Sequence, residues 1–416
     1  MRYFKKPIIE DDASQDSIKS KTAEIINHVM SGGLDAVKEL TARFDRYQGP
    51  LRVDKSMIDR CRDKLEPHVR DAVETASENI RMFHENQRAL LKDSEWETQP
   101  GVFTGIRFVP VESVAVYVPG GRYPLVSTVL MGVIPAQVAK VNRIVIVSPP
   151  RGNEGVDQSV LGVIGLLGVG EVWSIGGAQA IAAVALGVGD IEKVDMVVGP
   201  GNAYVTEAKR LMFGQIGIDG LAGPSEVLII ADTNAPVKNV ATDLLAQAEH
   251  DPLSISNLFC TSEDFANNVM RSIEDQLINL PTREIAQSAW HNNGSILVGT
   301  LDEAVAYAND SAPEHLELMV DNPKELLAQI HSYGSAFLGS HTSVPFGDFI
   351  TGTNHILPTG RAARFSGGVW TGTFLKALTH QEFTEKAPAQ FITHGVAIAQ
   401  AEGLAAHANS IKARGR

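Results

Sequence analysis

Four side chains that suit a single metal ion stand in polar, glycine-punctuated stretches of this sequence. Gln247 and His250 lie in LLAQAEHDP, Asp348 in PFGDFITGTNH and His407 in EGLAAHANS. The donors are nitrogen and oxygen only, so the set suits a borderline cation such as zinc in an exchangeable catalytic site. For Gln247 and His250 alone, a polar helix end whose histidine meets the last carbonyls explains the pair equally well. Taken together, the four residues favour an enzyme.

A carboxylate and an imidazole stand side by side in NDSAPEHLELMV, where a loop leads into an expected strand. His315 has the chemistry to take a proton from an alcohol, and Glu314 the chemistry to activate a water molecule. Adjacent strand residues point to opposite faces, but at an irregular strand entry both side chains reach one cavity. The alternative is a solvated surface pair, which isolated Glu-His pairs more often form.

The segment GSHTSVPFGDFITGTNHILPTGRAARFSGG concentrates polar side chains around Asp348, Asn354 and His355, between glycines that permit unusual backbone angles. Long ordered loops of this kind tend to be functional. Two glycine-rich turns, in VPGGRYPLVST and VGPGNAYVTEAK, follow expected strands and suit a phosphate or carboxylate. Neither fits the dinucleotide fingerprint, so composition permits a dinucleotide without demonstrating one.

Bulk composition excludes several classes of partner. The formal charge of −13 opposes sequence-independent nucleic-acid binding and adhesion to an anionic membrane, so a small-molecule partner is expected. We find no signal peptide and no apolar run of membrane-spanning length, which predicts a cytoplasmic protein. Cys61 and Cys260 are too few for a disulfide framework or a cysteine-based metal site.

The chain should be an α/β protein with two principal domains, since 416 residues exceed one compact core. Apolar residues at spacings of three and four predict a long amphipathic helix between Pro67 and Leu91. Continuous apolar runs predict buried parallel strands wrapped by helices. These runs are SVAVYVP, RIVIVSPP, EVWSIGG, VDMVVGP, EVLIIAD, SISNLFCTS, GSILVG and HLELMV. From about Phe365 the chain should return to helix.

Eight segments, in order along nearly the whole chain, closely resemble the histidinol dehydrogenase family. They are YVPGG, GGAQA, GPGNAYVTEAKR, AGPSEVLIIAD, QAEHDP, APEHLEL, GDFITGTNHILPT and AEGLAAHA. The resemblance implies an enzyme that uses zinc and NAD to oxidise a primary alcohol twice, through an aldehyde, to a carboxylate. It also implies an intertwined homodimer of two incomplete Rossmann-like domains with small terminal segments, in which the C-terminal segment of one chain completes the partner's site.

Carried onto matching positions, the resemblance assigns a role to each candidate residue. One Zn²⁺ per subunit would be held by Gln247, His250, Asp348 and His407, and Glu314 with His315 would form the acid/base pair. NAD would meet Tyr117, Gln179 and Asn202, and substrate would meet Ser225, His355 and Glu402. The implied segments are 1–16 at the N-terminus, 17–116 with 227–362 as the substrate and zinc domain, 117–226 as the NAD domain, and 363–416 as a C-terminal helical segment.

One departure from the family bears on the substrate. Histidinol enzymes resemble one another in placing a glutamate, which meets the substrate's ammonium, four residues before the zinc aspartate; here that position is Val344. An unpaired buried ammonium costs about 1–3 kcal/mol or more. Three arginines also stand where those enzymes have neutral residues: Arg122, Arg361 and Arg364. Guanidinium groups favour oxyanions, although each arginine is equally well explained as a surface residue.

These two changes favour an anionic substrate. GGRYP and GRAARFSGG resemble the sulfopropanediol 3-dehydrogenase branch, which implies oxidation of 2,3-dihydroxypropane-1-sulfonate to 3-sulfolactate in organosulfonate catabolism. The main alternative is histidinol dehydrogenase itself, in histidine biosynthesis. Two others are a non-catalytic sensor of a small anion or nucleotide, which the intact acid/base and zinc positions disfavour, and a zinc hydrolase, which the matches at the NAD positions disfavour.

Overall fold

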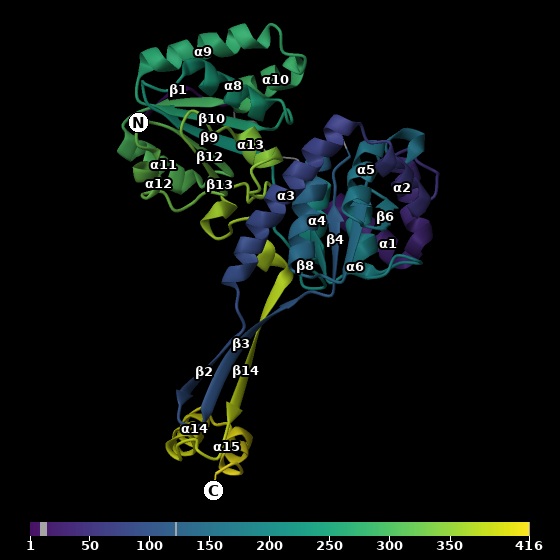
Figure 1. Ribbon diagram of the computed structural model, residues 1–416, viewed down its shortest axis with the longest axis vertical. Helices are drawn as coiled ribbons and strands as arrows, with labels where there is room; N and C mark the ends of the chain where they lie inside the picture. The colour runs from purple at the N-terminus through teal and green to yellow at the C-terminus, as the bar shows by residue number, and fades with distance from the viewer. Residues whose placement is uncertain (9–14, 121–122, 416) are drawn as a thin grey trace. The chain divides into compact units, whose positions relative to one another are not determined.

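The computed structural model describes residues 1–8, 15–120 and 123–415, which form two compact units (Figure 1). Unit 1 comprises Met1–Gln87 and Val111–Phe374, and unit 2 comprises Arg88–Pro110 and Leu375–Arg416. Unit 1 contains two sheets that are parallel apart from one edge strand, which confirms the predicted α/β class. Within the part of the chain that the structure describes, none of the helices is long and apolar enough to cross a membrane.

The first sheet of unit 1 has the order β1-β11-β10-β9-β12-β13, with β1 antiparallel to its neighbour. Alternate residues of β9 enter different cores: Val227 and Ile229 pack beneath α8, α9 and α10, while Leu228 and Ile230 pack beneath α11 and α12. A strand covered on both faces must be apolar throughout, as EVLIIAD is. The strands are β1 (Arg2–Lys5), β9 (Glu226–Ala231), β10 (Ile255–Cys260), β11 (Ser295–Val298), β12 (His315–Met319) and β13 (Ser335–Leu338).

Six helices accompany this sheet, and two of them carry candidate site residues. Helix α8 ends beside Gln247, and the short α13 begins at Val344 and includes Asp348. The six are α8 (Val237–Ala248), α9 (Glu263–Leu277), α10 (Arg283–Asn293), α11 (Leu301–Ser311), α12 (Pro323–Leu327) and α13 (Val344–Phe349).

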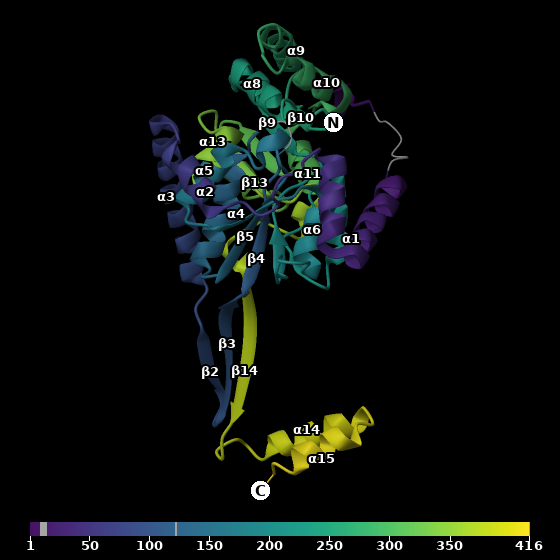
Figure 2. The same cartoon turned by 90° about the vertical axis from the view of Figure 1, so that its right-hand side faces the viewer.

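The second sheet is entirely parallel, with the order β6-β5-β4-β7-β8. Figure 2 shows α1 and α6 side by side next to this sheet. Its strands are β4 (Ser113–Tyr117), β5 (Arg143–Ser148), β6 (Glu171–Ser174), β7 (Met196–Val198) and β8 (Gly217–Ile218). The other helices of unit 1 are α1 (Gln15–Phe44), α2 (Lys55–Asp63), α3 (Pro67–Leu90), α4 (Val126–Val138), α5 (Gln158–Leu166), α6 (Gly177–Leu186) and α7 (Ala203–Met212).

The first two helices of the chain pack with the helices that accompany the five-stranded sheet. Helix α1 packs against α6 and α7, and α2 packs against α5. Val29, Val37 and Leu40 of α1 are buried in one core with β4 and α6. The apolar stripe of α1 therefore covers the five-stranded sheet, although 68 residues of chain (45–112) separate α1 from that sheet's first strand.

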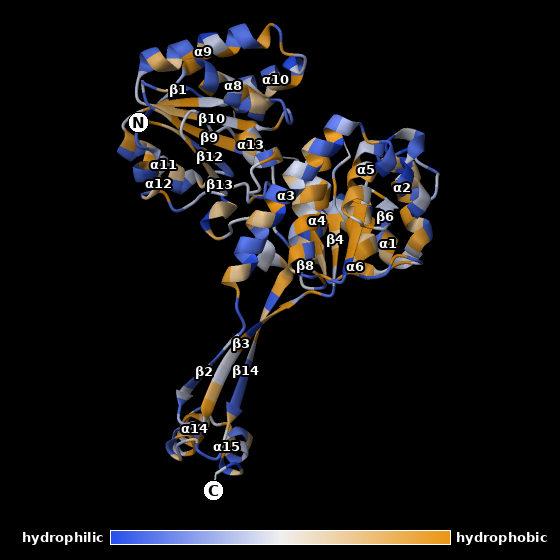
Figure 3. Cartoon of the chain, viewed as in Figure 1, coloured by the Kyte–Doolittle hydropathy of each residue, from blue (hydrophilic) through white to orange (hydrophobic). Residues whose placement is uncertain are grey.

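Unit 2 contains a three-stranded antiparallel sheet, β14-β3-β2, followed by two helices. Its elements are β2 (Ser94–Gln99), β3 (Val102–Pro110), β14 (Leu375–Phe383), α14 (Gln390–Ala401) and α15 (Ala405–Lys412). The expectation of a wholly helical C-terminal segment is wrong for β14, which pairs with β3 along its whole length. Figure 3 shows both hydrophilic and hydrophobic residues along these strands, and β14 is exposed over nearly all its residues, which is why its sequence lacks the signature of a buried strand.

Candidate active site

The predicted acid/base pair lies at the amino edge of the six-stranded sheet, where β9 and β12 begin side by side. Ser225 precedes β9, Glu314 precedes β12, and His315 is the first residue of β12. Glu314 and His315 are 6% and 4% exposed, so the alternative of a solvated surface pair is excluded. Although they are consecutive, the two side chains lie together, with His315 Nδ1 3.5 Å from Glu314 Oε2.

The Glu314 carboxylate is held by donors from the neighbouring strand. Its Oε2 accepts from the Ser225 hydroxyl at 2.7 Å and from the Glu226 N–H at 2.9 Å. Ser225 Oγ in turn accepts from Gln247 Nε2 at 2.9 Å. Helix α8 therefore places its last turn over the start of β9, and Ser225 links the amide of Gln247 to the carboxylate of Glu314.

His315 is oriented by its backbone neighbour and faces a second carboxylate. Its Nδ1–H donates to the Glu226 carbonyl at 3.1 Å, and its Nε2 lies 3.7 Å from Asp348 Oδ1. His355 joins the same cluster, because its Nδ1–H donates to the Asp348 carbonyl at 3.1 Å while the Thr128 hydroxyl donates to its Nε2 at 3.4 Å. The bond from Thr128 ties this cluster to α4 of the five-stranded sheet.

Burial and mutual charge set the protonation of these groups. Burial raises the pKa of Glu314 despite the nearby imidazole and the donors from Ser225 and Glu226. Burial acts to lower the pKa of His315, but the Glu314 and Asp348 carboxylates outweigh it and raise that pKa to about 9. Burial opposes ionisation of Asp348 as well, yet His315, His355 and His250 hold its pKa below the usual range. The site is therefore an acid/base network in which the His315 imidazole and the two carboxylates shift one another's pKa.

The residues expected at NAD lie at the carboxyl edge of the five-stranded sheet. The chain runs outward from β4 to β5 and β6, then returns to the other side of β4 as β7, so its order reverses between β4 and β7. Open parallel sheets bind ligands at this reversal point. Tyr117 ends β4, and Asn202 follows β7 as the N-cap of α7. Gln179 lies in the first turn of α6, whose Gly177 N–H donates to the Tyr117 hydroxyl at 3.1 Å.

The remaining predicted residues are placed elsewhere. Arg122 lies outside the described residues. Arg361 is exposed and pairs with Asp310 at 2.7 Å, and Arg364 is exposed in a 3-10 turn, Ala362–Arg364. Glu402 caps the end of α14 and His407 lies on α15, both in unit 2.

Two acids near this cluster, the half-buried Glu226 and the buried Glu317, were not predicted from sequence. Glu226 accepts from the Gly360 N–H at 2.9 Å, and burial raises its pKa to about 7. Glu317 is fully buried on β12 and accepts from the Val344 N–H at 2.9 Å, which anchors the start of α13. The signal available in the sequence was an acidic residue inside an apolar strand, as in HLELMV, since a strand buried on both faces tolerates a carboxylate only with a partner.

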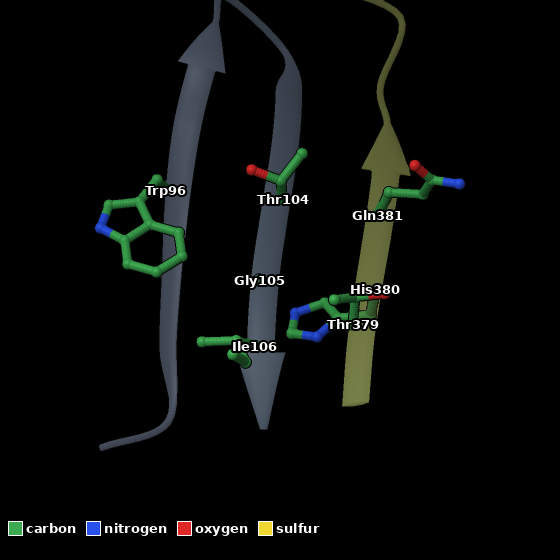
Figure 4. Close-up of a pocket in the computed structure, with 7 residues that line it drawn as sticks. All are labelled: Trp96, Thr104, Gly105, Ile106, Thr379, His380 and Gln381. Carbon is green, nitrogen blue, oxygen red and sulfur yellow. The ribbon is translucent and has the colours of Figure 1, made fainter. Parts of the chain in front are cut away.

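Unit 2 carries a separate hollow of about 460 Å³ on its three-stranded sheet. In Figure 4 the imidazole of His380 lies over Gly105, with Trp96 on the neighbouring strand. A Cβ at Gly105 would lie 2.2 Å from His380 Cε1, so a side chain there would displace the imidazole. His380 also pairs with Glu95 at 2.9 Å. The hollow is lined by Trp96, Thr104, Gly105, Ile106, Thr379, His380 and Gln381, none of which was predicted to do chemistry.

Comparison with known proteins bears on the chemistry of these clusters. The family model described as histidinol dehydrogenase matches residues 9–415. The chain belongs to the histidinol dehydrogenase family. Histidinol dehydrogenase of Zymomonas mobilis is 43% identical over 416 residues, covering 99% of this chain and 96% of its own. That of Methanothermobacter thermautotrophicus is 42% identical over 403 residues, covering 96% and 94%.

A solved structure of the family has the same fold. The crystal structure of histidinol dehydrogenase from Elizabethkingia anophelis superposes with a TM-score of 0.92 at 34% identity, covering 99% of this chain and 94% of its own. The chain is therefore a member of an oxidoreductase family whose dehydrogenases use NAD and Zn²⁺.

The side chains at the candidate site of this chain fit a zinc ion. His315 Nε2 is buried beside Asp348 without a hydrogen-bond partner among the described residues, and a cation held by Asp348 would offset the charge that raises the pKa of His315. Gln247 donates through Nε2, which leaves Oε1 for a metal. Among residues 1–8, 15–120 and 123–415, no group of three or more His, Cys, Asp or Glu side chains is placed to hold a metal ion. Of the four expected ligands, Gln247 is an amide and His407 belongs to unit 2, so only His250 and Asp348 count toward such a group within unit 1.

Replacing Ser225 by alanine should weaken the structure of this site. The change removes a donor from Glu314 and an acceptor from Gln247, which should lower the free energy of unfolding by about 1–3 kcal/mol. Urea unfolding monitored by tryptophan fluorescence measures this loss. Ser20→Ala, on the exposed surface of α1, is the matched control and should change stability by less than about 0.5 kcal/mol. Equal effects of the two substitutions would show that the Ser225 bridge contributes nothing.

Proposed function

We propose that this chain is a zinc-dependent, NAD-linked dehydrogenase that oxidises a primary alcohol twice, through an aldehyde, to a carboxylate. The observation that carries the proposal is the buried Glu314–His315 pair, joined to Gln247 through Ser225 and facing Asp348. A binding module for a small anion needs no buried proton-transfer pair. Membership in a family of dehydrogenases supports redox chemistry over hydrolysis.

The roles proposed for the residues follow from their atoms. With a cation at Asp348 to offset the carboxylates that raise the pKa of His315, its Nε2 would accept the proton of the substrate hydroxyl, because Nδ1 already donates to Glu226 and so fixes the ring. The Glu314 carboxylate takes a proton from the water that adds to the aldehyde, since burial raises its pKa and so makes it a stronger base, and the Ser225 hydroxyl orients it. Gln247, His250, Asp348 and His407 would hold zinc, which would supply a Lewis acid for the alcohol oxygen, and Tyr117, Gln179 and Asn202 would hold NAD, which would supply the hydride acceptor.

Neutral substitutions of the pair should separate catalysis from binding. His315→Asn and Glu314→Gln keep approximate size, and each should lower kcat by about 10²–10⁴ because general acid–base catalysis contributes that much. Zinc content by elemental analysis and NADH affinity by fluorescence should stay near wild type. His380→Asn on the exposed sheet of unit 2 is the control. An unchanged kcat in both site variants would refute these roles.

L-Histidinol is the first candidate substrate. The matching relatives from Zymomonas mobilis and Methanothermobacter thermautotrophicus are named histidinol dehydrogenases, and each covers nearly the whole of this chain. These names favour the histidine-biosynthesis alternative over the sulfonate diol that the sequence motifs first suggested.

The sulfonate diol 2,3-dihydroxypropane-1-sulfonate remains a second candidate because of one side chain. Val344 occupies the position where the resemblance places an ammonium-binding glutamate, and it is 7% exposed at the start of α13. No carboxylate at this position can pair with the ammonium of histidinol. The arginines add less support than the sequence suggested, because Arg361 is already paired with Asp310.

Restoring the missing carboxylate should distinguish the two substrates. If the active site selects an anionic diol, Val344→Glu should lower kcat/KM for the sulfonate diol and raise it for L-histidinol, by about tenfold or more in each direction. NADH formation by the zinc-loaded protein on both substrates measures this, with Val344→Gln as the uncharged control. Preferential turnover of histidinol by the wild type would refute the sulfonate diol and leave the first candidate.

We further propose a homodimer with shared active sites. In unit 2, large apolar side chains are exposed on the sheet and on α14, as expected for a surface that a second copy covers. They include Trp96, Leu378, Phe383 and Ile398. His407 and Glu402 are exposed as well, so they are free to complete a site of the partner.

Mixed dimers test the shared site. His315→Asn and His407→Ala should each be inactive alone. Coexpression of the two should restore about a quarter of the wild-type activity, because half of the dimers are mixed and each mixed dimer has one site with neither substitution. No recovery from coexpressed chains that light scattering shows to be dimeric would mean that each chain completes its own site.

A further inference from the structure

A buried ion pair joins α7 to the residue that follows β8. Lys209 on α7 contacts Asp219, and their side chains are only 3% and 5% exposed. Asp219 is also tied to the sheet, since its N–H donates to the Val197 carbonyl of β7 at 3.3 Å. Neither charge has solvent to stabilise it, so each depends on the other and on nearby backbone dipoles.

Both charged groups bind the same backbone residue. Lys209 Nζ donates to the Gly199 carbonyl at 3.0 Å, while Asp219 Oδ2 accepts from the Gly199 N–H at 2.7 Å. The N–H and the carbonyl of one glycine are thus held from opposite directions by opposite charges. Gly199 has φ = 118°, which favours glycine, and a Cβ there would lie 2.2 Å from the Tyr117 carbonyl oxygen.

The segment fixed in this way is the turn proposed to bind NAD. Gly199 directly follows β7, and the turn ends at Asn202, the N-cap of α7. Asn202 Oδ1 accepts from the Tyr204 and Val205 N–H groups at 3.1 Å each, which leaves its Nδ2 for a ligand. The close approach of Gly199 to Tyr117 sets the spacing of β4 and β7 where the strand order reverses.

A requirement for stability does not by itself explain this pair. Well-packed apolar residues of similar volume often replace a buried ion pair without loss of stability, whereas removing one partner alone strands a charge. Apolar side chains, however, could not hold the Gly199 peptide. What only the charged pair provides is therefore the two hydrogen bonds to Gly199 that fix the geometry of the turn.

We propose that Lys209 and Asp219 are positioning residues for the dinucleotide, presetting the turn of residues 199–202 against Tyr117. This inference rests on the proposed NAD-linked function. Neither side chain touches the cofactor in this scheme. The pair acts by holding the turn's N–H donors and Asn202 in the binding geometry before NAD arrives. The turn therefore loses less conformational entropy when NAD binds.

The double variant Lys209→Met with Asp219→Leu tests the proposal, because it removes both charges together. Its melting temperature should remain near that of the wild type, but its NADH affinity, measured by fluorescence titration, should fall about tenfold or more, as expected for the loss of two backbone hydrogen bonds. The Michaelis constant for NAD should rise more than kcat falls, and zinc content should be unchanged.

The exposed ion pair of Asp35 and Lys38 on α1 offers the matched control, and the double variant Asp35→Leu with Lys38→Met should bind NADH as the wild type does. Wild-type NADH affinity in a folded Lys209/Asp219 double variant would overturn the positioning role. If that variant does not fold, Lys209→Met with Asp219→Asn also leaves no buried charge and still removes the donor to the Gly199 carbonyl, so wild-type NADH affinity there would overturn the proposal equally. Failure of the wild-type protein to bind NADH would instead refute the NAD-linked function itself.

Discussion

The burial of Glu314 at the start of β12 is the constraint on which the rest of the site depends. A carboxylate without solvent must be given donors, and here the next strand supplies them through the Ser225 hydroxyl and the Glu226 N–H. Those bonds fix the entry of β12 against that of β9. His315 follows directly and takes its orientation from the Glu226 carbonyl. One buried charge therefore determines the geometry of the acid/base pair and of Gln247 above it.

The two sheets of unit 1 carry their candidate site residues at opposite edges. The acid/base cluster lies at the amino edge of the six-stranded sheet, whereas the proposed NAD residues lie at the carboxyl edge of the five-stranded sheet, where parallel sheets usually bind ligands. Two hydrogen bonds within unit 1 join the loop after α13 to α4. Asn354 Nδ2 donates to the Met131 carbonyl at 2.8 Å, and Thr128 donates to His355. The polar loop that follows α13 thus contacts α4 of the five-stranded sheet.

Buried ionisable side chains recur where a backbone group needs a partner. The Lys209–Asp219 pair binds a glycine with positive φ, and Glu317 binds the N–H of the first residue of α13. In both cases the side chain binds backbone. Inside a low-dielectric core such hydrogen bonds help to specify one arrangement of the chain.

Much of the fold was accessible from sequence because buried parallel strands must be apolar throughout. The runs SVAVYVP, EVLIIAD and HLELMV form β4, β9 and β12. The segment with apolar residues at spacings of three and four forms α3. The strand β14 was missed because it is exposed, so its sequence carries no requirement for burial. The sequence alone does not give the partner of α1, because an apolar stripe tells which face of a helix is buried but not which sheet covers it.

The sequence by itself determined the residue types of the candidate site and the entry of Glu314 and His315 into a strand, because turn residues and apolar runs are local signals. Only the tertiary structure decided that Ser225 bridges Gln247 and Glu314, that Asp348 faces His315, and that Arg361 is paired with Asp310. These contacts join residues 22 to 89 positions apart. Their geometry follows from strand order and helix packing, which no short stretch of sequence encodes.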